Sequence, residues 1–472
     1  MPATAPARAR TKTRLVSSAR RVPRDTDSRW PDVAAIVVAL SLLVVTALWL
    51  SNRGVQELAA GGGTTVTSIG RLLGLWGADL LLVQVLLMAR IPPVEQAFGQ
   101  DRLARWHRWV GFASFDLVVA HVVLIVFGYA ASDRQSLPRE AWDLVANYAG
   151  MLLATASFAL LILVAVTSMR AARRRLRYES WHLLHLYAYL GVGLALPHEL
   201  WTGNDFNSSE WARLYWWTIF GLAAGAMLAF RVGLPIHRTR RHQPRVAGVV
   251  READDVVSVH ISGRRLDELV LSGQFLQWRF RSGPGWTRAH PYSISAAPKP
   301  ASLRITVKAL GDESSLIGEL QPGTRVLVEG AYGRMTARAR RGTGVTLIGS
   351  GIGITPLRAL LEDLEYRPGE AVLIYRATDE ADLLFRDELD AIASRRGARI
   401  VYLPGRRAHE TSWLPDSAPK ISDAAALRHL VPDIRQHDVF VCGPDPWMQS
   451  VQRAAQRLHV PEDQLHIERF SW

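Results

Sequence analysis

The chain has 472 residues, of which 49% are apolar, and a formal net charge of +13. This combination excludes a uniform membrane protein and a uniform soluble enzyme, and the length allows two or three domains. The single cysteine, Cys442, excludes an intramolecular disulfide and a cysteine-rich metal or iron–sulfur site. The arginines do not form a basic face interleaved with aromatic residues, so nucleic-acid binding is not indicated. They cluster beside apolar runs, which indicates orientation in a membrane.

The first 30 residues are rich in arginine, alanine, proline and serine, which predicts a disordered basic cytoplasmic tail. Six apolar stretches follow, each close to the ~20 residues that cross a hydrocarbon core of ~30 Å. They lie at residues 32–50, 67–89, 108–130, 143–169, 181–201 and 212–234. The first stretch is too far from the N-terminus to favour a signal peptide. We therefore expect a six-helix transmembrane domain over residues 31–236, embedded in the plasma membrane.

The charges of the loops predict the orientation of these spans. Arginines are dense at residues 170–177 and 238–241, whereas the loops at 51–66, 131–142 and 202–210 are mixed or acidic. The excess of positive charge on cytoplasmic loops places both termini in the cytoplasm. Tryptophans near the predicted span ends fit an aromatic belt: Trp106, Trp109, Trp142, Trp181, Trp201, Trp211 and Trp217.

Four histidines occupy the third and fifth spans in two pairs. His107 and His121 are 14 residues apart, and His185 and His198 are 13 residues apart, so each pair spans ~20 Å along its helix. Both spans run from the cytoplasm outward, which places one histidine of each span at an inner level and one at an outer level. Neutral imidazole is an axial ligand for haem iron, and facing helices can hold one haem at each level. The sequence therefore predicts two b-type haems as metal centres.

A single intramembrane histidine is also compatible with a hydrogen-bonded packing role, so this alternative stays open for each residue. Around the helix axis, His121 lies within ~40° of His107 on the third span, whereas His198 lies ~140° from His185 on the fifth span. Pro197 offers a remedy, because proline kinks a helix and frees a carbonyl group. His182 shares a face with His185 and is a candidate propionate partner or substitute ligand.

After Pro244 the pattern changes to short alternating strands separated by glycine and proline, as in VAGVVREADDVVSVHIS and QFLQWRF. This pattern predicts an antiparallel β-barrel domain over residues 243–341. From Val345 onward, strands alternate with helices, which predicts an α/β domain with a parallel sheet over residues 342–472. The fold class is thus multidomain, with a helical membrane bundle, a barrel and an α/β domain.

The barrel contains RAHPYSISAAP at residues 288–298. This stretch resembles the flavin-binding signature of the ferredoxin–NADP reductase superfamily, in the His-Pro form of NADPH oxidases and ferric reductases. The resemblance implies that Tyr292 lies along the isoalloxazine, Ser293 reaches N5 and His290 approaches the phosphates. Two later stretches, LRITVKALGDESS and VLVEGAYG, match the family's next flavin contacts in order. The implied FAD-binding residues of all three segments are His290, Pro291, Tyr292, Ser293, Val307, Lys308, Tyr332 and Gly333.

A glycine-rich turn, GSGIGITPLRALL, follows a strand and opens a helix at residues 349–361. Glycines let the backbone approach a pyrophosphate, and the helix N-terminus favours its negative charge. Such a turn alone is also compatible with purely steric use of glycine. Here it matches the superfamily's nicotinamide-nucleotide signature, through Gly349, Gly351, Gly353, Thr355 and Pro356.

The C-terminal segments complete this resemblance. VFVCGPDPWM implies that Cys442, Gly443 and Pro444 lie beside the nicotinamide, although Cys442 is also compatible with a small buried apolar residue. The terminal HIERFSW implies that Glu468 acts near the flavin–nicotinamide junction and that Trp472 stacks on the flavin ring. Arg376 and Arg406 follow the second and third strands and are candidate ligands for a 2′-phosphate. No acidic residue ends the second strand, so NADPH is favoured over NADH.

Two membrane segments, RWHRWVGFASFDLVVAH and WHLLHLYAYL, resemble the transmembrane domain of bacterial ferric reductases and NADPH oxidases. The whole chain departs from that family in Tyr292, where phenylalanine is usual, and in its arginine-rich N-terminus. The resemblance implies a transmembrane flavocytochrome that moves electrons from cytoplasmic NADPH through FAD and two haems to an outer acceptor. Ferric iron, oxygen, a quinone or a partner protein are all possible acceptors. A membrane-anchored NAD(P)H:flavin reductase, or a transporter with a histidine proton relay, are the alternatives.

Overall fold

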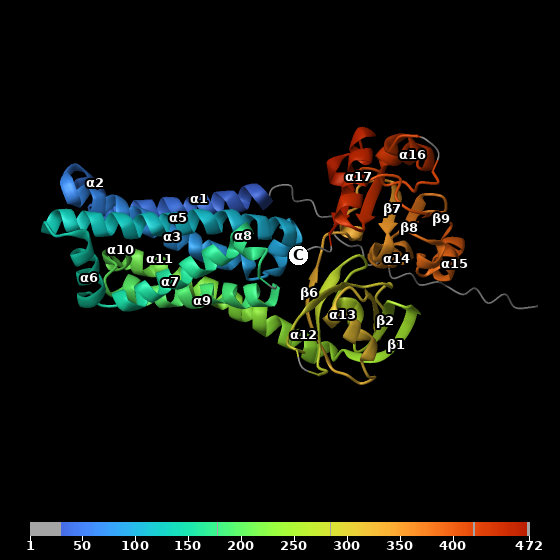
Figure 1. The fold of residues 1–472 in the computed structure, drawn as a ribbon, viewed down its shortest axis with the longest axis horizontal. Coiled ribbons are helices and arrows are strands. Elements are labelled where there is room, and N and C mark those ends of the chain that lie inside the picture. The colour runs from blue at the N-terminus through green and yellow to red at the C-terminus, as the bar shows by residue number, and fades with distance from the viewer. Residues whose placement is uncertain (1–29, 177, 284, 419–420, 470–472) are drawn as a thin grey trace, which may run out of the picture.

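The computed structural model describes residues 30–176, 178–283, 285–418 and 421–469. Figure 1 shows a bundle of long helices on one side and a part that contains the sheets on the other. Helix α12 (Leu234–His242) leads from the bundle into the sheets. The predicted disordered tail, apart from residue 30, and Trp472 lie outside the described residues.

Within the described residues, five stretches are long and apolar enough to cross a membrane: Asp32–Ser51, Gly62–Met88, Arg102–Asp133, Met151–Ser168 and Glu210–His242. The first four lie in helices α1 (Trp30–Ser51), α3 (Gly62–Met88), α5 (Gln100–Asp133) and α7 (Met151–Ser168). The last comprises α11 (Glu210–Ala226), a π-helix (Met227–Gly233) and α12. Short helices connect the long ones: α2 (Gly54–Ala59), α4 (Pro92–Phe98), α6 (Leu137–Asn147), α8 (Arg170–Arg173) and α10 (Asn204–Asn207).

The fifth predicted span folds as helix α9 (Tyr178–Trp201), whose 24 residues are long enough to cross a bilayer. It is not among the five stretches that are also apolar enough. Its histidines, tyrosines and Glu199 lower its hydropathy, so a sixth span at this place stays a prediction.

The fourth predicted span, 143–169, is wrong at its start. Helix α6 ends at Asn147, and α7 begins only at Met151. Between them Gly150 has a φ of 81°, a left-handed conformation that glycine adopts without steric cost. The apolar residues on both sides of this turn concealed it in the sequence pattern.

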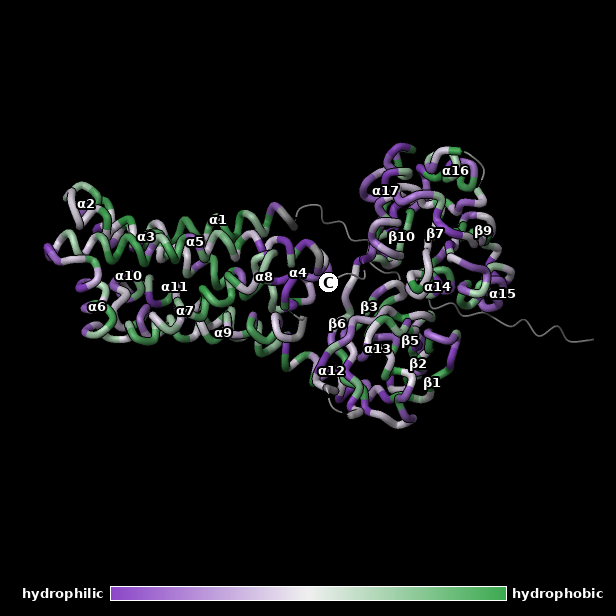
Figure 2. Tube along the Cα trace, in the orientation of Figure 1, coloured by the Kyte–Doolittle hydropathy of each residue, from purple (hydrophilic) through white to green (hydrophobic). Residues whose placement is uncertain are grey.

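The bundle is apolar on its outside as well as its inside. Figure 2 shows apolar residues along the long helices. Large apolar side chains such as Leu43, Leu152 and Leu228 are exposed. A helix that is apolar on all faces belongs in a large core or in lipid, and these exposed faces therefore fit a bilayer.

Helices α3 and α5 pack closely because glycines face each other. A Cβ atom on Gly63 would collide with the carbonyl oxygen of Gly128, and one on Gly77 would lie 2.9 Å from Cγ2 of Val118. Small residues let two membrane helices approach closely. This packing fixes α5, which carries two of the predicted haem ligands, against α3.

The middle of the chain forms two three-stranded antiparallel sheets. One has the order β1-β2-β5 and the other β4-β3-β6. The strands are β1 (Arg245–Ala253), β2 (Val256–Ser262), β3 (Phe275–Phe280), β4 (His290–Ser293), β5 (Ser302–Lys308) and β6 (Val326–Tyr332). Single bridges join β1 to the residue before β6 and β5 to the residue after β4. A closed barrel stays a prediction.

The C-terminal part contains the predicted parallel sheet, in the order β11-β10-β7-β8-β9. Its strands are β7 (Gly344–Ser350), β8 (Ala371–Ala377), β9 (Arg399–Pro404), β10 (His437–Cys442) and β11 (Leu465–Glu468). The connecting helices are α14 (Ile354–Asp363), α15 (Arg386–Arg396), α16 (Asp423–Leu430) and α17 (Asp445–Arg457). Because β7 and β10 are adjacent and parallel, the segments after both strands meet at one edge of the sheet.

Candidate functional site

The inner histidine pair is brought together by α5 and α9. The ring centroids of His107 and His185 are 5.9 Å apart, with the ring planes at 69°. Trp181, one turn earlier on α9, stacks on His185 with a centroid distance of 5.2 Å. The two imidazoles that the sequence pairs at one level therefore face each other.

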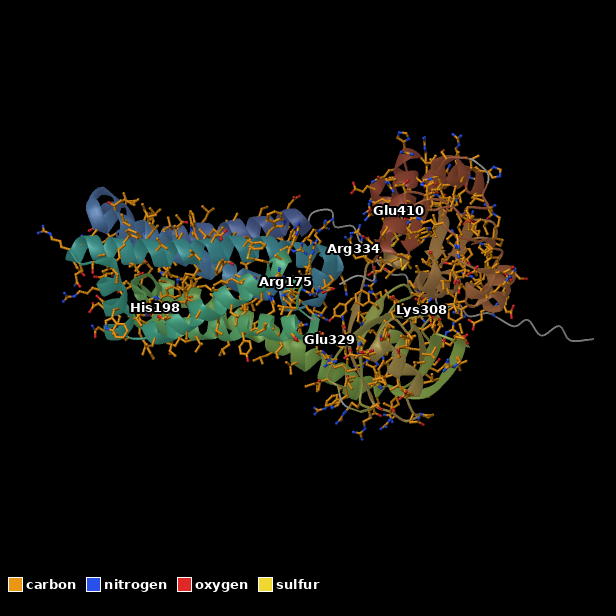
Figure 3. The ribbon with its side chains drawn as sticks, viewed as in Figure 1. Arg175, His198, Lys308, Glu329, Arg334 and Glu410 are labelled. Carbon is orange, nitrogen blue, oxygen red and sulfur yellow. The ribbon has the colours of Figure 1, made fainter. Side chains whose placement is uncertain are left out.

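The outer pair lies one level away along the same helices. His121 and His198 are close enough to interact electrostatically. Figure 3 places His198 toward the end of the bundle opposite the sheets, whereas Arg175 lies nearer the sheets. The dense arginines at 170–175 thus lie toward the sheet-containing end.

Nδ1 of each α5 histidine contacts a backbone carbonyl of α3. Nδ1 of His107 is 3.3 Å from the oxygen of Gln84, and Nδ1 of His121 is 2.8 Å from the oxygen of Gly70. A carbonyl oxygen only accepts, so Nδ1 must carry the ring proton and Nε2 keeps its lone pair. This is the tautomer that binds a metal through Nε2.

The α9 histidines contact hydroxyl groups instead. Nδ1 of His185 is 3.2 Å from Oγ of Ser168, and Nδ1 of His198 is 2.6 Å from Oγ1 of Thr202. Thr202 also donates its single proton to the carbonyl oxygen of His198 at 2.8 Å, so its oxygen accepts from Nδ1. His198 is therefore in the same tautomer as the α5 pair.

In the described part of the chain, Nε2 of these four histidines has no hydrogen-bond partner. The same residues contain no group of three or more histidine, cysteine, aspartate or glutamate side chains placed to hold a metal ion. Two-ligand coordination therefore fits the histidines better than a zinc-type cluster.

Two glycines make room for the outer pair. A Cβ atom on Gly74 would lie 2.5 Å from Nδ1 of His121, and one on Gly150 would lie 2.9 Å from the backbone nitrogen of His198. Only glycine leaves these histidines in their observed positions. Neither glycine was predicted as part of the site. A signal for Gly74 exists in the sequence, because Gly70, Gly74 and Gly77 form a small-residue stripe at helical spacing.

The predicted flavin segment forms strand β4. The rings of His290 and Tyr292 stack with a centroid distance of 5.9 Å and an interplanar angle of 13°. Trp278 on β3 donates from Nε1 to the carbonyl oxygen of Tyr292 at 2.9 Å, which fixes the strand. Oγ of Ser293 is buried and lacks a hydrogen-bond partner among the described residues. This hydroxyl is therefore able to hydrogen-bond a further group.

The other predicted flavin contacts are less direct. Val307 is buried on β5, and Nζ of Lys308 is 3.2 Å from a carboxylate oxygen of Asp255. Pro291 pairs with Gln277 on β3. Burial lowers the pKa of His290, which leaves its ring largely neutral at pH 7.

Cys442, Glu468 and Gly333 meet beside the end of the parallel sheet. Cys442 and Glu468 are opposite each other on β10 and β11. A Cβ atom on Gly333 would lie 3.2 Å from Oε2 of Glu468, and the φ of 94° at this position favours glycine. Burial, and then the Glu468 carboxylate, raise the pKa of the Cys442 thiol well above its ordinary value. Both interpretations of Cys442 from the sequence fit its position. The residue is fully buried, and it lies at the edge of the sheet where the nicotinamide is predicted to bind.

The glycine-rich turn lies against the same strand end. Gly351 has a φ of 54°, and a Cβ atom on Gly353 would collide with the carbonyl oxygen of Cys442. Thr355 donates from Oγ1 to the carbonyl oxygen of Ile352 at 3.0 Å, which closes the turn at the start of α14. Gly349 is the residue before the last of β7, Pro356 follows in the helix, and Gly443 and Pro444 follow Cys442. The two halves of the predicted nucleotide signature therefore lie together.

The two candidate phosphate ligands differ. Arg376 is buried, and its Nη1 donates to the carbonyl oxygens of Ala377, Leu403 and Gly405. Arg406 is exposed. Of the two guanidinium groups, Arg406 is the one already open to a ligand.

A group of charges that sequence reasoning missed joins the bundle to the sheets. Glu329 on β6 is buried, and its carboxylate lies 2.9 Å from Arg90, 3.3 Å from Arg231 and 3.2 Å from Arg279. Burial would raise the pKa of Glu329, but the three guanidinium groups outweigh it and lower the pKa. Tyr332 also donates to Glu329 at 3.2 Å. Arg90 and Arg231 come from membrane segments, so no local motif could have revealed this contact.

Comparison with known proteins gives two family matches. Residues 73–196 match the "Ferric reductase like transmembrane component" family, and residues 347–453 match the "Oxidoreductase NAD-binding domain" family. The first contains His107, His121 and His185 and ends two residues before His198, and the second contains the glycine-rich turn and Cys442.

Similar curated proteins include the ferredoxin reductase component of 3-ketosteroid-9-alpha-monooxygenase from Mycobacterium tuberculosis, at 30% identity over 48% of this chain. The chain covers 64% of the length of that relative. Ferredoxin–NADP reductase B of Sorangium cellulosum is 29% identical over 40% of this chain and 80% of its own length.

Among solved structures, flavohemoglobin from Malassezia yamatoensis covers 87% of this chain and all of its own (100%), at 16% identity and a TM-score of 0.43. The ferredoxin reductase of carbazole 1,9a-dioxygenase covers 49% of this chain and 69% of its own, at 20% identity and a TM-score of 0.40. The two family matches, in this order along one polypeptide, confirm the recognised architecture. The chain is a fusion of a ferric-reductase-like transmembrane domain with a ferredoxin–NADP-reductase-type oxidoreductase domain.

Proposed function

We propose that the protein is a transmembrane oxidoreductase that carries electrons from cytoplasmic NADPH, through FAD and two b-type haems, to an acceptor on the outer side. One observation carries this proposal: two helices present four imidazoles as an inner pair in ring contact and an outer pair close enough to interact, each with Nδ1 next to a protein oxygen. A histidine in a packing role is expected to use both ring nitrogens, whereas Nε2 of these four has no hydrogen-bond partner among the described residues. Metal-binding imidazoles show this pattern, because the second nitrogen orients the ring and sets its tautomer.

The residues fit haem at both levels. Haem iron held by two imidazoles exchanges single electrons. His107 and His185 would bind the inner haem, and His121 and His198 the outer one. The α3 carbonyls hold the α5 rings in place, and Gly74 leaves the space that the His121 ring needs. The two levels are ~20 Å apart along the helices, so together they extend across most of a bilayer.

The dehydrogenase residues fit FAD and a nicotinamide nucleotide. FAD accepts two electrons as a hydride and releases them one at a time. Tyr292 would lie along the isoalloxazine, and Ser293 would direct its unpartnered hydroxyl to N5. The turn Gly349–Gly353 would bind the pyrophosphate of the nucleotide at the start of α14. Cys442 and Glu468 would line the nicotinamide edge, and Trp472 would cover the ring in the resting state.

Arg406 would bind the 2′-phosphate that distinguishes NADPH from NADH. Arg376, held by three carbonyl oxygens, would shape the end of β8 and contact the phosphate only after a rearrangement. A ratio of Michaelis constants for the two nucleotides that is unchanged in Arg406→Gln would contradict this role.

The arginine-rich end of the bundle is adjacent to the sheets, which supports a cytoplasmic dehydrogenase and six spans with both termini inside. The domains would then be residues 31–236, 243–341 and 342–472. A protease added outside intact cells should leave residues 240–472 whole. Cleavage there in sealed right-side-out vesicles would contradict this topology.

A second candidate is a membrane-anchored NAD(P)H:flavin reductase that feeds a quinone or a partner protein. The relatives named as ferredoxin reductase components of oxygenases favour it, because their names describe electron delivery to a protein. This candidate needs no haem at either level.

A reduced-minus-oxidised absorbance spectrum of the purified protein separates the two candidates, since only the first predicts low-spin bis-histidine haem. Alanine at any one of the four paired histidines should remove about half of the haem. His237→Ala is the matched control, because that histidine is exposed on α12 outside both pairs. Full haem in all four single variants would show that the assignment is wrong.

A further inference from the structure

A cavity of about 170 Å³ lies where the bundle meets the sheets. It is lined by α4, by the last part of the Glu210–His242 span, by residues 267–271 and by the end of β6. Its volume is roughly ten times the ~10–15 Å³ that one water molecule needs. It is therefore large enough for a polar group bigger than water, at the level where the last span leaves the apolar region.

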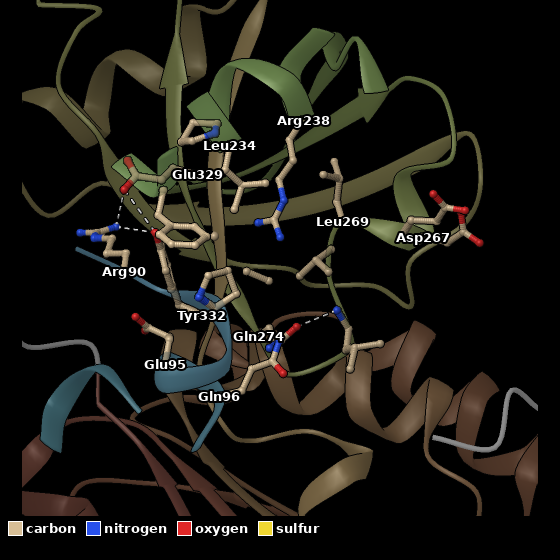
Figure 4. A pocket seen from close by; sticks show the side chains of 18 of the residues that line it. Arg90, Glu95, Gln96, Leu234, Arg238, Asp267, Leu269, Gln274, Glu329 and Tyr332 are labelled. Atoms are coloured by element: carbon tan, nitrogen blue, oxygen red, sulfur yellow. Dashed lines mark hydrogen bonds and ion pairs between the residues drawn. The ribbon is translucent and has the colours of Figure 1, made fainter. Parts of the chain in front are cut away.

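Among the residues that the structure describes, the guanidinium groups of two arginines in this cavity have no partner. Arg238, on α12, forms neither a hydrogen bond nor an ion pair with any residue that the structure describes, and it is only partly exposed. Figure 4 shows its guanidinium pointing into the space between Tyr332 and Leu269. Nε of Arg338 is buried and also lacks a partner there. A half-buried cation without a counterion loses part of its hydration, so this arrangement favours an anion in the cavity.

The carboxylates of the lining do not supply that anion. Glu329 is already bound by three arginines, and Glu268 by Arg241 and Arg265. Glu95 has interactions of its own. Figure 4 shows Asp267 on the far side of Leu269 from Arg238.

Two neutral polar side chains of the lining already form hydrogen bonds. The Tyr332 hydroxyl accepts from Arg90 at 2.8 Å, and Nε2 of Gln274 donates to the carbonyl oxygen of Gly333 at 3.1 Å. Among the described residues, Arg238, Arg338 and Asp267 are therefore the charged groups of the lining without a side-chain partner. Leu269 separates Asp267 from Arg238 (Figure 4), so the charge beside Arg238 is positive.

The surroundings select the kind of anion. Phe230, Leu234 and Pro235, on the membrane side, give the cavity an apolar wall. Of the predicted flavin residues, Tyr332 lines the cavity, whereas His290, Tyr292 and Ser293 do not. We propose that Arg238 and Arg338 bind the phosphate of an anionic phospholipid headgroup, with the acyl chains along Phe230 and Leu234. This lipid would fasten the membrane domain to the flavin domain at their junction.

The test uses the full chain in nanodiscs of phosphatidylcholine, with or without phosphatidylglycerol. Phosphatidylglycerol should raise the thermal unfolding midpoint of the wild-type protein by several degrees, and native mass spectrometry should detect retained lipid. Arg238→Gln and Arg338→Gln should each weaken retention about fivefold, the usual effect of one arginine near an anionic headgroup. Arg240→Gln is the matched control, because Arg240 is exposed two residues away on the same helix and does not line the cavity.

Four outcomes would overturn the proposal. The first is a wild-type midpoint that does not respond to phosphatidylglycerol, which is decisive even where a variant fails to fold. The second is an equal loss in Arg240→Gln, which would indicate general surface charge. The third is an equal stabilisation by millimolar inorganic phosphate in phosphatidylcholine discs, which would indicate a soluble anion. The fourth is a loss of bound FAD from Arg238→Gln in those discs, which would assign the cavity to the flavin. None of these readouts depends on haem.

Discussion

Nη1 of Arg90 lies 2.9 Å from Oε1 of Glu329, and this contact joins the end of the third helix to the last strand of the flavin sheet. The same nitrogen donates to the hydroxyl of Tyr332 at 2.8 Å, and the guanidinium lies over the Tyr332 ring at 4.7 Å. One arginine of the membrane domain thus contacts a residue of the predicted flavin site. The junction between the domains is therefore built from buried charges and one aromatic ring.

Glu329→Gln should weaken this junction, because it leaves Arg90 and Arg231 without their carboxylate. Removing one partner of a buried ion pair costs on the order of 3 kcal/mol. NADPH-dependent haem reduction should slow by tenfold or more, while flavin content and reduction by dithionite stay unchanged. Stopped-flow absorbance measures both rates. Glu319→Gln, an exposed change on the same sheet-containing part, is the control. Equal rates in Glu329→Gln and wild type would contradict a role in coupling the domains.

Gly74→Ala should displace the His121 ring, because the added Cβ atom would lie 2.5 Å from Nδ1. We expect about half of the haem to be lost, from the outer level only. Haem extracted per mole of protein, with the remaining absorbance spectrum, measures this. The control is Gly193→Ala on α9, where an added Cβ atom meets nothing within 4 Å. Full haem in Gly74→Ala would show that His121 is not held at this place.

The stability of the dehydrogenase should depend on Glu388 in acid. Its carboxylate lies 2.8 Å from Nη1 of Arg304 on β5 and 2.6 Å from Nε of Arg358 on α14. Burial opposes ionisation, but these two guanidinium groups lower the pKa of Glu388 to about 2. A lowered pKa stabilises the fold above the ordinary value of about 4.5, and this contribution is lost as the pH falls toward 2.

Glu388→Gln should therefore reduce the free energy of unfolding at pH 6 and flatten its decline between pH 5 and pH 3. Urea titrations at several pH values measure this. Glu410→Gln, a change at an exposed position, should keep the wild-type slope. An unchanged pH profile in Glu388→Gln would show that the ion pairs do not contribute.

Cys442 should resist thiol reagents in the folded protein. It is fully buried, and burial together with Glu468 keeps the thiol protonated. Because it is the single cysteine of the chain, the extent of labelling reports on it alone. Labelling by a disulfide reagent at pH 8 should be negligible in buffer and complete in urea. Rapid labelling of the native protein would place the thiol in an open nicotinamide site.

Trp472→Ser should tighten nicotinamide binding and reduce the discrimination between NADPH and NADH. A terminal aromatic ring on the flavin occupies the place that the nicotinamide needs. Aromatic stacking contributes ~0.5–1.5 kcal/mol beyond area burial, so the change should be several-fold to about tenfold. Michaelis constants for both nucleotides measure it, with haem content as the control. Constants identical to those of the wild type would assign Trp472 to packing on the sheets.

The parallel sheet could be predicted from the sequence because each strand is a short apolar run with a helix between it and the next. The pairing of His107 with His185 could be predicted because the charges of the loops indicate the direction of each helix. The direction in turn indicates which histidines lie at the same depth in the membrane. The turn at Gly150 between α6 and α7 could not be predicted, because apolar residues lie on both sides of it. Nor could the contacts of Arg90 or Glu388, which join residues far apart in the chain and depend on how the domains pack.

The carbonyl oxygens of Gln84 and Gly70 belong to the main chain, and no substitution can remove them. The hydroxyls of Ser168 and Thr202 belong to side chains, and a single substitution can remove either of them. Each proposed haem level would thus have one histidine with a permanent partner and one with a replaceable partner. A stronger hydrogen bond at Nδ1 makes an imidazole a more basic ligand, which shifts the reduction potential of the iron. Natural variation at positions 168 and 202 could therefore tune each level separately, without disturbing the helix pair that holds the other two histidines.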